Sequence, residues 1–260
     1  MAGGLPICKL RPPKRLIIPL GLEEQVSNNL RRAFLQQSAA VASGLLVPTL
    51  AIAQSQPKKE SDELEVTPNE DLMREHGLLR RVLLIYDESV MRLTQHSKGK
   101  PDFDSGVVIQ CADIVRKFVE DYHEMLEQEH VFPRVRMKGE LTTLVNTLLD
   151  QHRIGRLLTD RIKQSASTAL KNKDDATTLA HAIYNFQHMY RPHAAWEDTV
   201  LFPAFKATLS QHEYDALGED FEKVETQKFG EEGFEHVLAE VAQIEKKLGI
   251  DDPSHYTPQV

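Results

Sequence analysis

Histidine is the residue type whose placement in this sequence indicates chemistry. The chain contains 11 histidines, and two of them open the same eleven-residue frame. In this frame, glutamate follows the histidine by four positions, and a hydrophobic residue, Phe and Pro close it. The frame runs from His123 to Pro133 and again from His193 to Pro203. Residues i and i+4 share one face of a helix, so each histidine and its glutamate can reach the same metal ion or two adjacent ions.

Two further histidines form a second matched pair. His76 and His152 are each preceded by Glu or Gln and followed four residues later by Arg80 and Arg156. The chain thus reads as two helical hairpins, each with one lone histidine and one His-x3-Glu pair. Inward-facing imidazoles and carboxylates from four helices make a dimetal site in a bundle core. The predicted metal ligands are His76, His123, Glu127, His152, His193 and Glu197.

A single His-x3-Glu pair is weak support for a metal site, because such pairs are common on exposed helix faces. His236 and Glu240 have the same spacing without a Phe-Pro tail, and we expect them to be such a pair. The conjunction of two matched frames with two matched lone histidines is what favours a metal. Mixed imidazole and carboxylate ligation suits iron, and also manganese or zinc. Near the site, Trp196 is expected to pack between helices.

Helical periodicity accounts for most of the chain after residue 66. Capping boxes predict helix starts at Thr67-Pro68-Asn69-Glu70 and at Ser210–Glu213. No segment alternates like a strand, so we predict an all-α fold: an up-down-up-down four-helix bundle with additional C-terminal helices. The expected helices span about 68–96, 105–131, 139–171, 175–201 and 210–228, with a last helix ending near Gly249.

The N-terminal region reads as a targeting segment. The motif Arg31-Arg32-Ala33-Phe34-Leu35 precedes a weakly apolar run, 38–53, that ends in Ala51-Ile52-Ala53. This order resembles a twin-arginine export signal with a cleavage site before Gln54, and it predicts a periplasmic protein. The alternative is an N-terminal anchor that is not cleaved, although the run is shorter than the roughly 20 residues that a span needs. No membrane span is expected after removal of the signal.

These observations divide the chain into four predicted parts. They are the signal region 1–53, a flexible lead-in 54–66, a four-helix bundle 67–205 and a C-terminal helical extension 206–260 that packs on the bundle.

Composition excludes several classes of function. The 260 residues include 31 Lys+Arg and 39 Asp+Glu, for a formal net charge of −8, and no sustained basic block is present. This argues against nucleic acid as a partner. Two cysteines exclude a disulfide framework and a cysteine-rich metal site. The sequence also lacks a nucleotide fingerprint and a glycine-rich phosphate loop.

The histidine pattern over about residues 68–205 resembles the hemerythrin-like family of cation-binding (HHE) bundles. The resemblance implies a non-haem di-iron centre in which the four histidines are terminal ligands and Glu127 and Glu197 bridge. In oxygen-carrying hemerythrins a second histidine stands where this chain has Arg156, and the last helix has His-x4-Asp instead of His193-x3-Glu197. The set of four histidines and two glutamates is closer to iron-centre repair proteins, but their cysteine-bearing N-terminal module is missing here.

Several functions remain open at this stage. The first is a protein that binds or senses a diatomic gas, O2 or NO, and a sensor would need a partner protein because no output domain is present. The second is a di-iron enzyme acting on peroxide, O2 or NO with an external redox partner. The third is an iron store or donor, or an iron-centre repair protein.

Overall fold

The structure is a computed structural model that describes residues 66–95, 104–168 and 173–258. The predicted signal and all but the last residue of the lead-in lie outside the described residues. Within them the secondary structure is helical and contains no strand. The segments are α2 (Pro68–Gln95), α3 (Gly106–Ile114), η1 (Val115–His123), α4 (Glu124–Leu126), η2 (Glu127–Val131), α5 (Phe132–Lys138), α6 (Thr142–Ser167), α7 (Lys173–Trp196), η3 (Glu197–Leu201), α8 (Phe202–Lys206), α9 (Gln211–Phe229), α10 (Gly233–Leu248) and η4 (Pro253–Tyr256).

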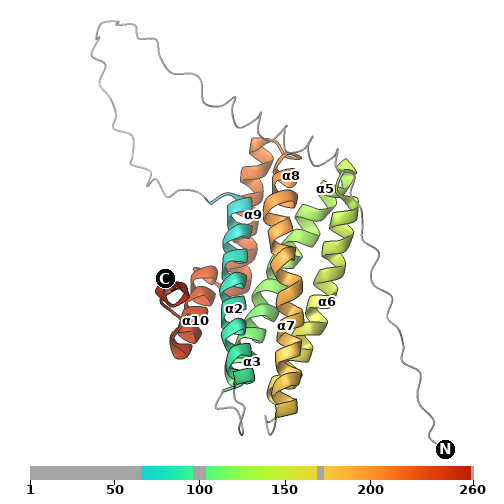
Figure 1. Ribbon diagram of the computed structural model, residues 1–260. Helices are drawn as coiled ribbons and strands as arrows, with labels where there is room; N and C mark the ends of the chain where they lie inside the picture. The colour runs from blue at the N-terminus through green and yellow to red at the C-terminus, as the bar shows by residue number, and fades with distance from the viewer. Residues whose placement is uncertain (1–65, 96–103, 169–172, 259–260) are drawn as a thin grey trace, which may run out of the picture. The chain divides into compact units, whose positions relative to one another are not determined.

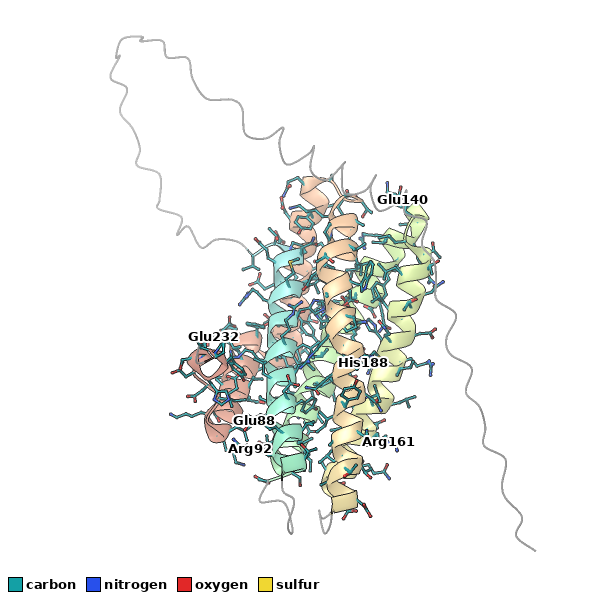
Figure 2. All side chains as sticks on the ribbon, viewed as in Figure 1. Glu88, Arg92, Glu140, Arg161, His188 and Glu232 are labelled. Atoms are coloured by element: carbon teal, nitrogen blue, oxygen red, sulfur yellow. The ribbon has the colours of Figure 1, made fainter. Side chains whose placement is uncertain are left out.

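The long helical segments lie side by side as a bundle (Figure 1). Helix α7 packs against both α2 and α6, and α6 packs against α3. The C-terminal helices α9 and α10 both contact α2, where Arg81 donates to both carboxylate oxygens of Glu245, at 2.8 and 2.5 Å. Charged side chains such as Glu140 and Arg161 lie on the outer faces (Figure 2). Among the described residues, no helix has the length and apolarity needed to cross a membrane.

The hydrophobic face predicted for the first helix is the one that α2 buries. Leu72, Leu79, Val82, Leu83 and Tyr86 are all 3% exposed or less. This spacing of three and four residues keeps one stripe of the helix in contact with its neighbours. The neighbouring His76 lies on the same buried side and is 1% exposed. The packing of α2 therefore fixes the position of His76 along the length of the bundle.

Both predicted capping boxes are present. The backbone N–H of Thr67 donates to Glu70 at 3.1 Å, and the Ser210 side chain accepts from the N–H of Glu213 while Glu213 accepts from Ser210. The third helix starts later than predicted, at Thr142. The reason is that Gly139, with φ 78°, adopts the left-handed conformation that ends α5.

The two Phe-Pro steps do not end their helices, contrary to the sequence prediction. The chain continues through Pro133 as α5 and through Pro203 as α8. The preceding segments η2 and η3 are π-helical, and the N–H groups of Phe132 and Phe202 donate to carbonyls five residues back. Each proline then lies in the first turn of a new α-helical segment, where its missing N–H costs little.

Trp196 does not pack between helices as expected, since it is 45% exposed. Successive residues on a helix differ in direction by about 100°. Because Glu197 faces the interior with 0% exposure, its neighbour is turned toward the outer surface of α7.

We expect Gly155→Ala and Gly77→Ala to have opposite effects on stability. A Cβ at Gly155 would lie 2.0 Å from the Tyr190 hydroxyl, which donates to Glu124 at 2.8 Å. Overpacking of this kind should lower the free energy of unfolding by about 1–3 kcal/mol. A Cβ at Gly77 would meet nothing within 4 Å, so alanine there should add about 0.5–1 kcal/mol. Urea denaturation of the metal-free protein measures both, and a stabilising Gly155→Ala would contradict this account of the packing.

Candidate metal centre

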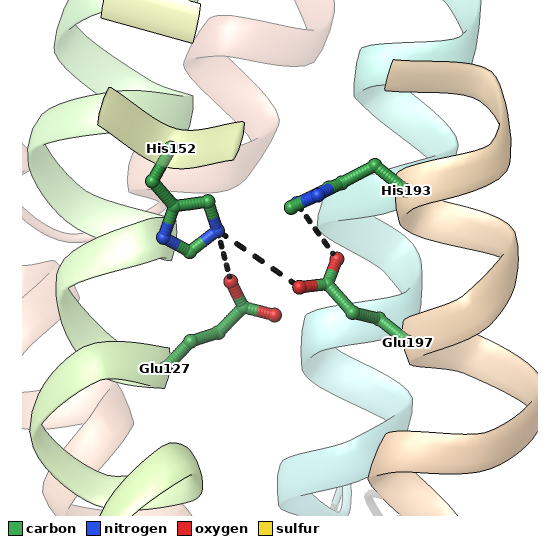
Figure 3. Close-up of side chains that lie close together, drawn as sticks. All are labelled: Glu127, His152, His193 and Glu197. Carbon is green, nitrogen blue, oxygen red and sulfur yellow. Dashed lines mark ion pairs between the residues drawn. The ribbon is translucent and has the colours of Figure 1, made fainter. Parts of the chain in front are cut away.

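The structure brings all six sequence-predicted ligands together in the bundle interior. Each of them is 3% exposed or less. Their ligand atoms fall into two overlapping groups, each spanning no more than 4.8 Å. One group is Glu127, His152, His193 and Glu197 (Figure 3), and the other is His76, His123 and Glu127.

Each glutamate lies between histidines of different hairpins. Glu127 has one carboxylate oxygen 3.5 Å from His123 Nε2 and the other 3.3 Å from His152 Nε2. The Glu127 carboxylate therefore lies between a histidine of the first hairpin and a histidine of the second. For Glu197 the neighbours are His193 Nε2 at 3.1 Å, His76 Nε2 at 3.3 Å and His152 Nε2 at 3.9 Å.

The histidines pair into two subsites. His76 Nε2 and His123 Nε2 are 3.0 Å apart, and we call this pair the His76–His123 subsite. Two nitrogens on adjacent positions of one ion, each about 2.0–2.1 Å from it, have about this separation. The rings of His152 and His193 are 5.0 Å apart between centroids, and they form the His152–His193 subsite.

The donor set fits a metal because its oxygens are otherwise unsatisfied. All four carboxylate oxygens of Glu127 and Glu197 are buried and accept no hydrogen bond, and His152 Nε2 is buried and makes no hydrogen bond either. Buried polar groups in proteins are nearly always hydrogen-bonded, and a buried carboxylate without compensation is costly. Cations bound between the imidazoles and carboxylates would satisfy every one of these atoms.

The charges of the site are strongly coupled in the metal-free chain. Burial alone would raise the pKa of Glu127, but the positive charge of His123 outweighs it and holds that pKa well below its ordinary value. Burial would lower the pKa of His123, but Glu127 and Glu75 raise it well above the ordinary value. For His152, burial lowers the pKa and contacts with Glu127 do not fully offset it.

The Phe of each Phe-Pro tail packs on the histidine and glutamate cluster from the opposite hairpin. Phe132 stacks on His152 and Phe202 stacks on His76, both with ring centroids 5.4 Å apart. The tail that made the two frames recognisable is therefore part of the site. It shields a lone histidine of the other hairpin from water.

Four supporting side chains were missed by the sequence analysis. Each histidine turns Nε2 inward, and its Nδ1 contacts a carboxylate or an amide of the adjacent helix. Such contacts orient a ligating imidazole. The pairs and distances are His76–Asp198 2.6 Å, His123–Glu75 2.5 Å, His152–Gln128 2.9 Å and His193–Gln151 2.9 Å.

A sequence signal for these four side chains exists. Glu75 and Gln151 stand directly before the lone histidines, and Gln128 and Asp198 stand directly after the frame glutamates. Each supporting residue is thus a sequence neighbour of one ligand, but it contacts the histidine of the next helix. The contact partner could not be read from the sequence because it depends on how the helices are arranged.

The other residues singled out from the sequence lie outside the ligand groups. Arg80 pairs with Asp198 and so reaches the site indirectly, whereas Arg156 pairs with Asp121 at 2.5 Å. His236 and Glu240 are exposed on α10, as expected for a solvated pair. A further histidine outside these patterns, His188, is also exposed and stacks on Tyr184 on the outer face of α7 (Figure 2).

Three carboxylates gather behind His123. Asp71, Glu75 and Glu225 bring oxygens within 4.8 Å of one another. Glu75 Oε1 is buried and has no hydrogen-bond partner there. Burial, followed by the charges of Glu75 and Glu225, raises the pKa of Asp71 to about 7.

Comparison with known proteins identifies the family. Residues 67–205 and 143–248 match the model of the hemerythrin HHE cation binding domain. Relatives include uncharacterized proteins of Mycobacterium tuberculosis and Mycobacterium bovis, each 40% identical over 235 residues, or 88% of this chain and 91% of the relative. No solved structure matches the chain significantly. The chain therefore belongs to the hemerythrin HHE cation-binding family, as its histidine pattern predicted, and its His/Glu cluster could hold a metal.

We expect Asp71→Asn to stabilise the metal-free protein at high pH only. An unfolded aspartate releases its proton near pH 4, whereas folded Asp71 keeps it until about pH 7. The free energy of unfolding therefore falls as pH rises through this window. Asn cannot ionise, so the variant should be the more stable by on the order of 2 kcal/mol at pH 8, and by little at pH 4. Urea denaturation in the presence of a chelator measures this, and an equal difference at both pH values would contradict it.

Proposed function

We propose that this protein holds two iron ions among its six buried ligands and uses this di-iron centre to bind or sense O2 or NO. One observation carries the proposal. The four oxygens of Glu127 and Glu197 are buried without hydrogen bonds between four imidazoles. This is a donor set for two cations bridged by carboxylates, in a chain that belongs to a cation-binding family.

The proposed bundle has the up-down-up-down arrangement of four helices. Its members are α2, the run α3–α5, α6 and the run α7–α8. The packing of α7 on both α2 and α6 supports this arrangement, as do the contacts of α6 with α3 and of α2 with η1. In this arrangement, each pair of adjacent helices makes one of the four contacts between a histidine Nδ1 and its supporting side chain. Four such contacts are expected when the four helices form a closed ring.

The ligand chemistry favours iron over softer metals. Imidazole and carboxylate suit iron, manganese and zinc, and the site has no thiolate or thioether among its six proposed ligands. Four carboxylates contact the imidazoles, namely Glu127, Glu197, Glu75 and Asp198. Their combined negative charge suits a pair of divalent cations. When bound, reduced iron supplies the electrons and open coordination positions that a diatomic gas requires.

The surroundings of the site favour a small ligand. No predicted ligand is more than 3% exposed, and Phe132 and Phe202 cover the two lone histidines. An organic substrate would need an open pocket at the ligands, whereas a diatomic gas needs far less space. The same burial opposes rapid release of metal, which a store or donor requires. A sensor function would place a partner protein on the outer surface.

We expect His123→Ala and His193→Ala each to lose most bound iron, because each removes a ligand from one subsite. His236→Ala is the matched control, since His236 also precedes a glutamate by four residues but is exposed. Metal analysis of the purified variants measures the iron content. Loss of iron in His236→Ala with retention in His123→Ala would overturn the assigned site.

We expect the reduced, iron-loaded protein to develop new near-ultraviolet and visible absorption bands on exposure to O2 or to NO. Bands that persist indicate a binder or sensor. Bands that decay with turnover of added peroxide, O2 or NO indicate an enzyme instead. Absence of any spectral change in a protein with two irons would contradict gas binding.

We further propose that the protein is exported through the twin-arginine pathway. The support is the motif Arg31-Arg32-Ala33-Phe34-Leu35, which precedes an apolar run ending in Ala51-Ile52-Ala53. The match to the mycobacterial relatives also extends into residues 1–53, because residues 54–260 are too few to make up 88% of a 260-residue chain. Replacing Arg31 and Arg32 with Lys should retain the protein in the cytoplasm. Cell fractionation and the intact mass of the periplasmic protein test this, with loss of residues 1–53 as the expected result. A full-length mass in the membrane fraction would favour an anchor.

A further inference from the structure

The six predicted ligands are alike in the two helical hairpins, but the side chains behind the histidines are not. Glu75 and Gln151 occupy the same position, directly before the lone histidine of each hairpin. Gln128 and Asp198 share the position directly after the glutamate of each frame. At both equivalent positions, one hairpin therefore has a carboxylate and the other has an amide.

The two carboxylates act on the same subsite. Glu75 Oε2 lies 2.5 Å from His123 Nδ1, and Asp198 Oδ1 lies 2.6 Å from His76 Nδ1. Both belong to short, charge-assisted contacts in a buried environment, where the local dielectric is low. Because His123 and His76 form one subsite, the influence of the two negative charges adds there.

The two amides act on the other subsite. Gln128 lies 2.9 Å from His152 Nδ1, and Gln151 lies 2.9 Å from His193 Nδ1. An amide orients an imidazole ring as a carboxylate does. It has no net charge, however, so it adds no comparable negative potential at this subsite.

The arginines one turn after the lone histidines show the same difference. Arg80 pairs with Asp198, which anchors that carboxylate behind His76. At the equivalent position of the other hairpin, Arg156 pairs with Asp121 at 2.5 Å and with the buried Glu124 at 3.7 Å. The residue equivalent to Asp198 there is Gln128, which offers no charge to an arginine. The asymmetry therefore extends to the outer surface of the bundle.

We infer that Glu75 and Asp198 are positioning residues that make the His76–His123 subsite the tighter of two unequal metal subsites. A carboxylate bonded to the outer nitrogen of an imidazole raises the basicity of that ligand and fixes its orientation. The inference rests on the proposed dimetal centre, but it does not depend on the gas that the centre binds.

The test exchanges charge without changing the shape of the supporting side chains. One double variant is Glu75→Gln with Asp198→Asn, and the opposite one is Gln128→Glu with Gln151→Glu. Anaerobic titration with Co²⁺ and with Fe²⁺ gives the two stepwise binding constants of the full chain. We expect the unmodified protein to bind its first ion at least about tenfold more tightly than its second.

The first double variant should lose about 10- to 100-fold at the tighter step and little at the weaker one, so that the two steps merge. The second should strengthen the weaker step. Mössbauer spectra of the ⁵⁷Fe-loaded protein provide an independent readout. We expect two distinct quadrupole doublets of equal area in the unmodified protein, and convergence of the two in the first variant.

Asp71→Asn is the control for crowding of carboxylates around Glu75. It removes a neighbouring charge but leaves the contact between Glu75 and His123, so both binding constants should stay within a few-fold of the unmodified protein. Circular dichroism verifies that every variant keeps its helical content. Equal losses at both steps in the first variant, or identical steps and doublets in the unmodified protein, would overturn the inference.

The outcomes separate this inference from the proposed function. A protein that binds two Co²⁺ or Fe²⁺ ions unequally but does not respond to O2 or NO supports the inference and contradicts gas binding. A protein that responds to O2 or NO but binds its two ions with equal affinity supports gas binding and contradicts the inference. Failure to bind any metal overturns both.

Discussion

The rest of the structure depends on the burial of two carboxylates that have no hydrogen-bond donors. Glu127 and Glu197 are 0% exposed, and none of their four oxygens accepts a hydrogen bond. Desolvation of each ion costs several kcal/mol unless a positive charge compensates it. In the metal-free chain, the compensation of Glu127 comes from His123, whose pKa Glu127 and Glu75 raise against the effect of burial. For Glu197, burial would raise the pKa, but His193 and His76 lower it. Bound cations would replace that proton, so metal binding and stability of the bundle are coupled.

The backbone adapts to this layer of charges. Glu127 and Glu197 are each the first residue of a π-helical segment, and their carbonyls accept from Phe132 and Phe202 five residues later. π-Helical turns inside α-helices occur mostly at functional sites. Here they let the helix pass through a proline and continue by a further turn. The same two phenylalanines stack on the lone histidines of the opposite hairpin, so one sequence motif shapes the backbone and covers the site.

Much of this could be predicted from the sequence, because helix periodicity and i,i+4 spacing are local properties. The buried face of α2, the capping boxes and the convergence of six separated residues all follow from them. The predicted helix ends near Pro133 and Pro203 were wrong. A proline is expected to end an α-helix, but here each proline follows a π-helical turn and the chain continues as a helix. The partners of the histidine Nδ1 atoms could not be predicted, because Glu75 and Gln128 support histidines of neighbouring helices. The outward position of Trp196 follows from the inward position of Glu197, which the packing prediction for that tryptophan did not take into account.

The repeated frame explains the geometry of the site, but it cannot explain a difference between its two halves. Each hairpin supplies one lone histidine and one His-x3-Glu pair, so the ligands alone would define two equal metal positions. Any chemical difference between two bound ions must therefore come from residues outside the ligand pattern. Glu75 and Asp198 are such residues, and both contact the His76–His123 pair. A carboxylate in one hairpin and an amide at the equivalent position of the other is the difference that this bundle offers between the two halves of its site.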